Sequence, residues 1–354
     1  VFGPVLGPVL GTMVTELYNW RAAFVMIVPP GCCAMICIWF ALRGLNQRSS
    51  MRLDWTGFLA LSVAMVAAQL VLDRGHRMDW FDSPVLLLIA AVGLVALWIF
   101  VCHCLTAENP FLNPRLLLNR NFTIGLAIAF VMGMLSFASL TLFPSLLHDL
   151  RGYPDKVIGS LVAARGLGNW LAFLVIVPFS RMAPRVAIAT GLGFQAFAGL
   201  WMAQFDINLT FADIFWTHLL LGFGQSITFT PMTVMAFSTL PREQLTEGSA
   251  IFTMMRNFGS SLFISLTVLV MVRSTSVNYA RMSEFVNPYN SNLQFWDFPS
   301  AWNLDTVAGL ITLSNEIQRQ AAMIGYVNAF LLIGLVALVA VPLACFLQRV
   351  PTGP

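Results

Sequence analysis

The sequence predicts an all-α protein that crosses a membrane many times, and two observations predict this class. Of the 354 residues, 58% are hydrophobic and only 10% are charged, with a mean hydropathy of +0.78. Soluble domains carry about 25% charged residues, because their surface must be solvated. Apolar runs of about 20 residues, enough to cross roughly 30 Å of hydrocarbon as a helix, also follow one another along the whole chain.

Nine complete membrane spans are predicted from these runs, and a tenth helix is predicted over residues 1–15. Short connections punctuated by glycine and proline separate the spans. The tenth helix begins in mid-pattern, with neither an initiator Met nor a basic leader, so we expect further spans before it. The nine spans are 22–42, 55–72, 84–103, 122–147, 156–180, 186–205, 212–237, 248–272 and 323–347.

One connection is much longer than the others. Residues 273–322 form a predicted loop of about 50 residues, a length that is uncommon for a simple connection. Leu304, Val307, Ile311 and Ile317 recur within it at roughly helical spacing. We therefore expect a short helix on the surface of this loop.

Lys and Arg residues in alternate connections predict the orientation in the membrane. One side carries nine of them and the other eight, and Arg273, Arg281 and Arg319 of the second group belong to the long loop. Charges in long loops have little influence on insertion. The side with nine is therefore predicted to be cytoplasmic, which places the long loop outside.

Charge and cysteine usage exclude several other classes. The net charge is +3 and no dense basic cluster is present, so nucleic acid is not an expected partner. The six cysteines lie in or beside apolar runs, where cysteine acts as a small hydrophobic residue, and none has a metal-ligand spacing with histidine. No nucleophile–base pair or phosphate loop is visible. We predict no enzyme activity, no catalytic residue, no metal and no cofactor.

A glycine–proline motif occupies residues 3–11. Gly3, Gly7 and Gly11 recur every four residues and form one smooth helix face, on which another backbone can lie closely. Pro4 and Pro8 remove helix hydrogen bonds and favour a bend. Ordinary packing of small residues is the alternative explanation.

Two arginines, Arg165 and Arg256, lie about a third of the way along apolar spans, and each begins a tetrad that ends in glycine. A charge at bilayer depth costs about 2.5 to 3.5 kcal/mol on insertion scales, so it requires a reason. The arginines either attract an anionic group or a carboxylate across an interior surface, or they bind backbone carbonyls and extend toward the membrane surface. Both explanations are open from sequence.

These motifs resemble those of the EmrB/QacA-type drug:proton antiporters, the fourteen-span members of the major facilitator superfamily. Residues 3–11 are similar to the end of the antiporter signature in the fifth span of that family. The similarity extends through nearly the whole chain. Further matching segments are Tyr18-Asn19-Trp20-Arg21, Pro29-Pro30-Gly31, Asp54-Trp55-Thr56-Gly57, Asp79-Trp80-Phe81, Arg165-Gly166-Leu167-Gly168 and Gln320-Ala321-Ala322-Met323-Ile324.

The resemblance implies a major facilitator fold and a division of the chain into three parts. Residues 1–42 would be the fifth and sixth spans, at the end of the N-terminal half. Residues 43–121 would hold two inserted membrane helices with their linkers, and residues 122–354 the complete C-terminal half of six helices. Departures from the family pattern, at Thr12, Val28 and the connection 180–185, concern gating rather than the fold.

Each half of such a transporter contains two inverted three-helix repeats. Arg165 and Arg256, which are 91 residues apart, would then occupy equivalent positions in the two repeats of the C-terminal half. Because the repeats are inverted, Arg165 would enter the membrane from outside and Arg256 from the cytoplasm.

The resemblance also implies that spans 122–147 and 212–237 line the substrate cavity. Polar residues near one face of the second span are candidates for a cavity wall, with a hydrogen-bonded structural histidine as the alternative: Thr217, His218, Gln225 and Thr228. Aromatic residues and methionine are candidates for the apolar surface of a promiscuous site, with lipid contact or helix packing as the alternative: Phe137, Phe143, Trp170, Phe223, Phe229 and Met232.

The predicted function is a secondary active multidrug exporter. It would move amphipathic or lipophilic compounds outward across a bacterial inner (plasma) membrane by proton-coupled antiport and alternating access. The acidic residues lie in loops or near span ends, so proton-coupling residues are expected in the preceding spans. Besides the lipid bilayer, the small amphipathic substrate and protons, the implied partners are an outer-membrane channel and a periplasmic adaptor that contacts residues 273–322. The alternatives are a narrow-substrate metabolite exporter and a non-transporting membrane fragment.

Overall fold

Helices make up all the regular structure in the part of the chain that the computed structural model describes. That part comprises residues 3–43, 54–75, 77–78, 80–107, 110–287, 290, 302 and 306–348. The α-helices are α1 (Gly3–Leu17), α2 (Trp20–Val25), α3 (Val28–Leu42), α4 (Trp55–Gly75), α5 (Pro84–Thr106), α6 (Arg120–Arg151), α7 (Asp155–Met182), α8 (Pro184–Met202), α9 (Phe211–Phe237), α10 (Leu245–Ser283), α11 (Val307–Ala340) and α12 (Leu343–Phe346). Short 3-10 helices are η1 (Trp80–Asp82), η2 (Pro114–Leu118) and η3 (Arg242–Gln244).

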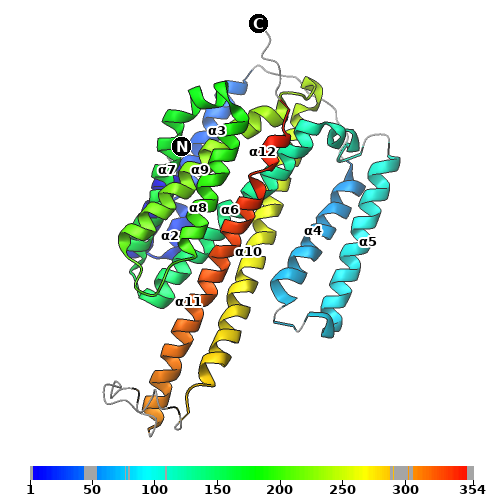
Figure 1. The fold of residues 1–354 in the computed structure, drawn as a ribbon. Helices are drawn as coiled ribbons and strands as arrows, with labels where there is room; N and C mark the ends of the chain where they lie inside the picture. The colour runs from blue at the N-terminus through cyan, green and yellow to red at the C-terminus, as the bar shows by residue number, and fades with distance from the viewer. Residues whose placement is uncertain are drawn as a thin grey trace.

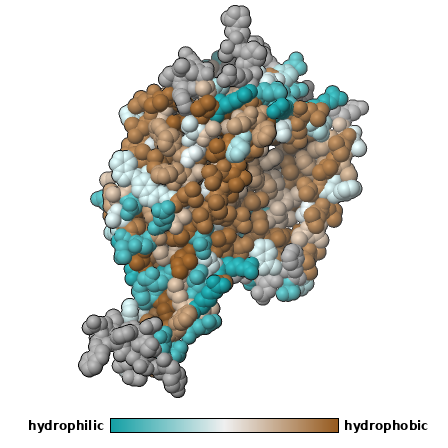
Figure 2. Space-filling model, in the orientation of Figure 1, coloured by the Kyte–Doolittle hydropathy of each residue, from teal (hydrophilic) through white to brown (hydrophobic). Residues whose placement is uncertain are grey.

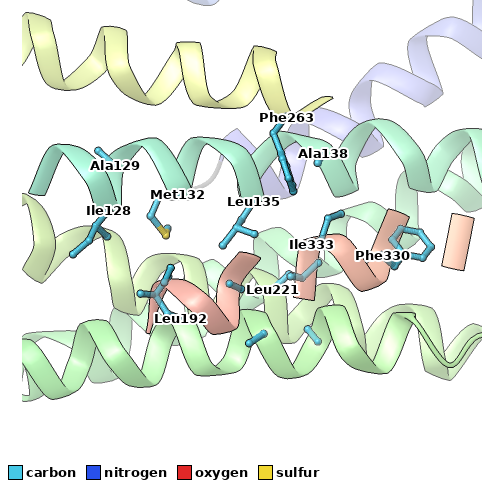
Figure 3. Close-up of a cluster of buried hydrophobic side chains, with 14 of the residues drawn as sticks. Ile128, Ala129, Met132, Leu135, Ala138, Leu192, Leu221, Phe263, Phe330 and Ile333 are labelled. Atoms are coloured by element: carbon cyan, nitrogen blue, oxygen red, sulfur yellow. The ribbon is translucent and has the colours of Figure 1, made fainter. Parts of the chain in front are cut away.

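A bundle formed by α6 to α11 holds the main hydrophobic core (Figure 1). Helix α6 runs through it, packing on α10 and α11, while α9 packs on both α7 and α8. Figure 3 shows Met132 and Leu135 of α6 among side chains of the surrounding helices, with Leu192 from α8 and Leu221 from α9. These side chains are buried, so the bundle has a solid apolar interior.

The predicted membrane class is confirmed. Among the described residues, eight helical segments are long and apolar enough to cross a membrane. Figure 2 shows an outer face that is mostly hydrophobic, with hydrophilic residues gathered toward its two ends. Helix α8, predicted as a span at 186–205, is not among the eight, although its 19 residues form a continuous helix.

The predicted span 22–42 is bent rather than continuous. It consists of α2 and α3, separated at Met26 and Ile27. Pro29 and Pro30 explain the break, because proline has no N–H and is tolerated only in the first turn of a helix. The two pieces together still have the length and hydropathy of one span.

Asp54, from the Asp54-Trp55-Thr56-Gly57 segment, connects α4 to the linker after α5. Its carboxylate accepts hydrogen bonds from the N–H groups of Gly57 at 3.0 Å and Phe111 at 2.8 Å, and lies 2.9 Å from Nε2 of His103. Burial alone would raise the pKa of Asp54, but these three partners outweigh it and lower the pKa. The same linker is fixed to α10, because Asn113 N–H donates to Glu247 at 2.8 Å.

The prediction of a loop over residues 273–322 with a separate surface helix is wrong. Helix α10 continues to Ser283 and α11 already begins at Val307, so most of this segment extends the two membrane helices. Val307, Ile311 and Ile317 belong to α11 rather than to an independent helix, and Leu304 lies outside the described residues. The helical periodicity of Val307, Ile311 and Ile317 is confirmed, but a period does not reveal that a helix continues into the next span.

The extended ends of α10 and α11 form a helical hairpin that projects beyond the other helices (Figure 1). At 39 residues, α10 is about 58 Å long, nearly twice the thickness of the hydrocarbon core. Tyr279 and Ser314 share a hydrogen bond of 2.8 Å across the hairpin, and Asn328 donates to Ser274 at 2.6 Å. The two helices are therefore held together along this extension.

Backbone contacts at glycines fix the two helix pairs that carry the arginines. A Cβ at Gly222 of α9 would overlap the carbonyl oxygen of Arg165 on α7, and a Cβ at Gly133 of α6 would overlap that of Arg256 on α10. Glycine permits this because small residues let helix backbones approach closely in membranes.

The contacts are reciprocal within each pair. Gly168, three residues after Arg165, lies against the carbonyl of Leu219, and Gly259, three residues after Arg256, lies against that of Phe130. We call the contacts of Arg165, Gly168, Leu219 and Gly222 the α7–α9 clamp, and those of Arg256, Gly259, Phe130 and Gly133 the α6–α10 clamp. The two tetrads that resemble each other in sequence thus make the same contact with their partner helices.

Alanine at the clamp glycines should destabilise the protein. Gly222→Ala and Gly133→Ala each force two backbones apart, and overpacking of this kind costs about 1 to 3 kcal/mol. We expect a lower midpoint of thermal unfolding for both variants purified in detergent. Gly193→Ala is the control, since nothing lies within 4 Å of its added Cβ. Midpoints that match this control would contradict the close approach.

Candidate functional site

Arg165 lies inside the helix bundle, with only 5% of its surface exposed. Its Nη1 donates to the hydroxyl of Ser139 on α6 at 2.8 Å, and Nη2 and Nε donate to Oε1 of Gln225 on α9 at 2.7 and 3.2 Å. These acceptors are neutral, and within the described residues no carboxylate pairs with Arg165. The guanidinium thus joins three helices through hydrogen bonds, which compensate part of the cost of burying it.

Arg256 has a different environment at the equivalent point of α10. Its Cζ lies 5.6 Å from the centre of the Phe229 ring on α9, a cation–π distance. Its Nε is buried and has no hydrogen-bond partner in the part of the chain that the structure describes. Arg256 is therefore the less satisfied of the two charges.

The four polar residues expected on one face of α9 point to different neighbours. Thr217, His218 and Thr228 are fully buried, and only Gln225 reaches Arg165. The His218 ring packs edge-on against Phe143 at 4.3 Å and donates from Nδ1 to the Ile214 carbonyl at 3.1 Å. In this structure the His218 side chain is buried in the core between α6 and α9 and does not line an open cavity.

Thr228 lies against α8. Its hydroxyl donates to the Gly224 carbonyl at 2.8 Å and accepts from the amide of Gln195 at 3.5 Å. A Cβ at Gly191 would overlap this hydroxyl, so α8 and α9 are in close contact here. Thr228 thus takes part in helix packing.

Of the aromatic candidates predicted from sequence, two are open to the surroundings. Phe137 on α6 is 45% exposed and Trp170 on α7 is 42% exposed. Phe229 is partly buried under Arg256 and lies 6.4 Å from the ring of Phe252. Phe143 and Met232 are fully buried, and Phe223 packs on a small apolar cluster with Ile227.

The glycine–proline motif lies on α1, which packs against α7. Within 4 Å of a Cβ at Gly7 or Gly11, no atom is present among the described residues. Gly7 and Gly11 thus have no close backbone contact from the other described helices, and Gly11 borders a recess of about 610 Å³ against α6 and α7. Gly3, Pro4 and Pro8 lie in α1, but their side chains fall outside the described residues.

Sequence reasoning missed the partners of both arginines. Ser139, Gly133 and Gly222 carry no motif of their own. One signal was available: Gly133 and Gly222 are 89 residues apart, close to the 91 that separate the arginines. Matching spacings of this kind indicate repeated helix pairs.

Membrane-length helices around a buried, hydrogen-bonded charge, with two helix pairs joined by the same contact, define a polytopic membrane protein of the transporter class. The family follows from comparison. The family model described as Major Facilitator Superfamily matches residues 1–264, so the chain belongs to this superfamily of transporters. The members are transporters rather than enzymes.

Named relatives specify the branch. The chain is 29% identical over 297 residues to the multidrug export protein EmrB of Escherichia coli K12, covering 83% of this chain and 58% of that protein. It is 27% identical to EmrB of Haemophilus influenzae over 92% of this chain and 64% of the relative. It is 26% identical to the fatty acid resistance protein FarB of Neisseria gonorrhoeae, over 97% and 68%. The resemblance to the EmrB-type members is confirmed, and the chain spans less than two thirds of the length of the first two relatives.

Among solved structures, the chain is similar to that of a bacterial homologue of the human lysosomal transporter Spinster in an inward-facing and occupied conformation. The TM-score is 0.48 at 12% identity, with 84% of this chain and 69% of the other covered.

Removing the main acceptor of Arg165 should weaken the bundle. In Gln225→Leu, Nε and Nη2 lose their partner, and hydrogen bonds to a charged group contribute about 1.5 to 3 kcal/mol. We expect a lower midpoint of thermal unfolding in detergent, whereas Gln225→Glu, which keeps the acceptor, should retain it. Thr233→Val is the control, because in the described part of the chain its hydroxyl donates to the Phe229 carbonyl of its own helix and to no other helix. Equal midpoints for Gln225→Leu and the control would exclude a structural role for this contact.

Proposed function

We propose that the protein is a secondary active exporter of amphipathic or lipophilic compounds, driven by proton antiport in a bacterial inner membrane. The observation that carries the proposal is Arg256, a charge within a membrane span whose Nε lacks a hydrogen-bond partner among the described residues. A charge placed in this way is a functional-site candidate by default. The multidrug export function named for EmrB, which is similar over most of this chain, supports the substrate class.

The division of the chain into parts belongs to the same proposal. Residues 1–42 act as the end of the N-terminal half, 43–121 as two inserted helices with linkers, and 122–354 as the C-terminal half. The α7–α9 and α6–α10 clamps support the assignment of Arg165 and Arg256 to equivalent points of inverted repeats. Alternating access would then move the clamped pairs as rigid units.

The two arginines take different roles in this proposal. Arg165 already has three hydrogen bonds to neutral groups, and it holds α6, α7 and α9 together. Among the described residues, Arg256 contacts the Phe229 ring and its Nε has no hydrogen-bond partner, so it can attract an anionic group or a carboxylate of the other half. Exposed Phe137 and Trp170 supply apolar surface for varied ligands.

Transport by the intact protein tests this function. Inside-out vesicles with an acidic interior should accumulate a fluorescent lipophilic dye, and an uncoupler should abolish the uptake. Arg256→Ala should lower the rate at least tenfold, about the loss of one charge-assisted contact, while its abundance in the membrane stays near that of the unchanged protein. Uptake that ignores the pH gradient would refute proton coupling, and equal losses of rate and abundance would make Arg256 structural.

We also propose that the α10–α11 hairpin binds a periplasmic adaptor that links the exporter to an outer-membrane channel. Its projecting part carries exposed apolar side chains, among them Phe285, Val307 and Ile311, which are 68%, 75% and 56% exposed. Exposed apolar residues grouped in this way are typical of protein interfaces. The position of the hairpin beyond the other helices supports contact with a partner outside the membrane (Figure 1).

A charge on the hairpin should disrupt that contact. Ile311→Glu introduces a carboxylate into the apolar surface, so co-purification with the cognate adaptor should fall several-fold. Thr312→Glu adds the same charge at the next residue without removing apolar surface, and serves as the control. Co-purification that both variants retain equally would reject the hairpin as the adaptor site and leave the export function unaffected.

A further inference from the structure

A groove of about 840 Å³ separates α4 from the first half of α10. Figure 1 shows α4 and α5 beside α10, apart from the remainder of the bundle. Met65 and Val66 of α4 line one wall, and Met254 and Phe258 of α10 contribute apolar groups to the other. Its volume falls in the range of about 300 to 1,000 Å³ that is usual for small-molecule sites.

A polar stripe on α10 faces this groove. Thr246, Ser249, Thr253 and Asn257 recur every three or four residues, line the groove and are exposed. They belong to a helix that is long and apolar enough to cross a membrane. Polar groups in a membrane helix avoid lipid and face protein, water or ligand. The stripe therefore indicates that the groove is occupied by something other than lipid tails.

Gln69 of α4 provides an unsatisfied acceptor at one end of the groove. Its Nε2 donates to Asp73 at 3.1 Å and to the Ser265 hydroxyl at 2.8 Å, which fixes the orientation of the amide. Its Oε1 is buried and accepts no hydrogen bond within the described part of the chain. Leaving a buried acceptor unpaired is costly, so this oxygen requires a donor from outside these residues.

We propose that this groove binds one amphipathic molecule that carries a hydrogen-bond donor, such as a primary alkylammonium. The donor group bonds Oε1 of Gln69, beside the negative charge of Asp73. The apolar body lies against Met65, Met254 and Phe258, where the two methionines adapt to varied shapes. This inference rests on the proposed export function only in treating the bound molecule as a substrate.

Arg74 and Arg77 bear on whether the ligand is selected by its hydrogen bond to Gln69 or by its attraction to the charge of Asp73. Together with Asp73 they border a separate recess beyond the groove. Their positive charges offset the attraction of Asp73 for a cation. Selection then depends on the hydrogen bond to Gln69 more than on net charge, so two cations that differ only in donor ability should bind differently.

Two fluorescent probes separate these contributions: a dansylated long-chain primary alkylammonium and its quaternary trimethylammonium analogue. Both are cations, but only the first can donate a hydrogen bond. We expect the protein, purified as the intact transporter, to bind the primary form about tenfold more tightly in a fluorescence titration. In Gln69→Leu the two probes should bind alike, while Gln69→Glu should restore the preference.

A variant that fills the groove provides a second test. Ser249→Trp should weaken binding of both probes, whereas Val95→Trp, on the exposed surface of α5, should leave it unchanged. If Ser249→Trp does not fold, the probe pair on the unchanged protein and on Gln69→Leu decides the question. Equal binding of the two probes to the unchanged protein would overturn the proposal, and so would a preference that survives in Gln69→Leu.

Measuring export of the two probes, alongside their binding, distinguishes failure of the groove proposal from failure of the proposed export function. If vesicles export the primary probe while binding shows no preference for it, the groove proposal fails alone. If binding shows the preference but neither probe is exported, the site stands and the proposed export function fails.

Discussion

Close contact between helix backbones at glycine is the constraint on which this structure depends. At the α7–α9 clamp and again at the α6–α10 clamp, an arginine carbonyl lies where a Cβ of the partner helix would be. This contact sets the distance between the helices and the position of each arginine, and therefore which side chains of the neighbouring helices the arginine can reach. Arg165 reaches Gln225, three residues after its clamp glycine, and Arg256 reaches Phe229 of α9.

Arg165 and Arg256 make the same backbone contact with a partner helix, but their side chains have different partners, and this difference separates their roles. Buried charges are tolerated when hydrogen bonds replace the water they lose. Arg165 has such bonds to an amide and a hydroxyl, neither of which depends on protonation. Arg256 has an aromatic face and an unpaired Nε. Two similar backbone contacts are thus accompanied by one arginine with hydrogen bonds to neighbouring helices and one whose Nε has no partner in the described part of the chain.

Features of this molecule that depend on residues close together in the chain could be predicted from the sequence, whereas those that depend on distant residues could not. Apolar runs and prolines act locally, so the spans and the resemblance to EmrB-type transporters could be predicted. The extension of α10 and α11 could not, because polar positions at 273–283 and 307–322 suit a surface helix and the continuation of a membrane helix equally well. The clamp partners Gly133 and Gly222 and the acceptor Ser139 were missed, since each acquires its role from a helix far away in the chain. The contacts of the polar residues on α9 could not be predicted for a related reason: Gln225 and Thr228 are close in sequence, yet one faces α7 and the other α8.

The most direct test of this account is a cryo-electron microscopy structure of the intact transporter in lipid nanodiscs, determined with and without a bound substrate. The account predicts that the Arg165 carbonyl stays against Gly222, and the Arg256 carbonyl against Gly133, in both states, while surrounding helices move. Separation of either pair in one of the states would contradict it, because the clamps could then not act as the fixed frame of the arginines.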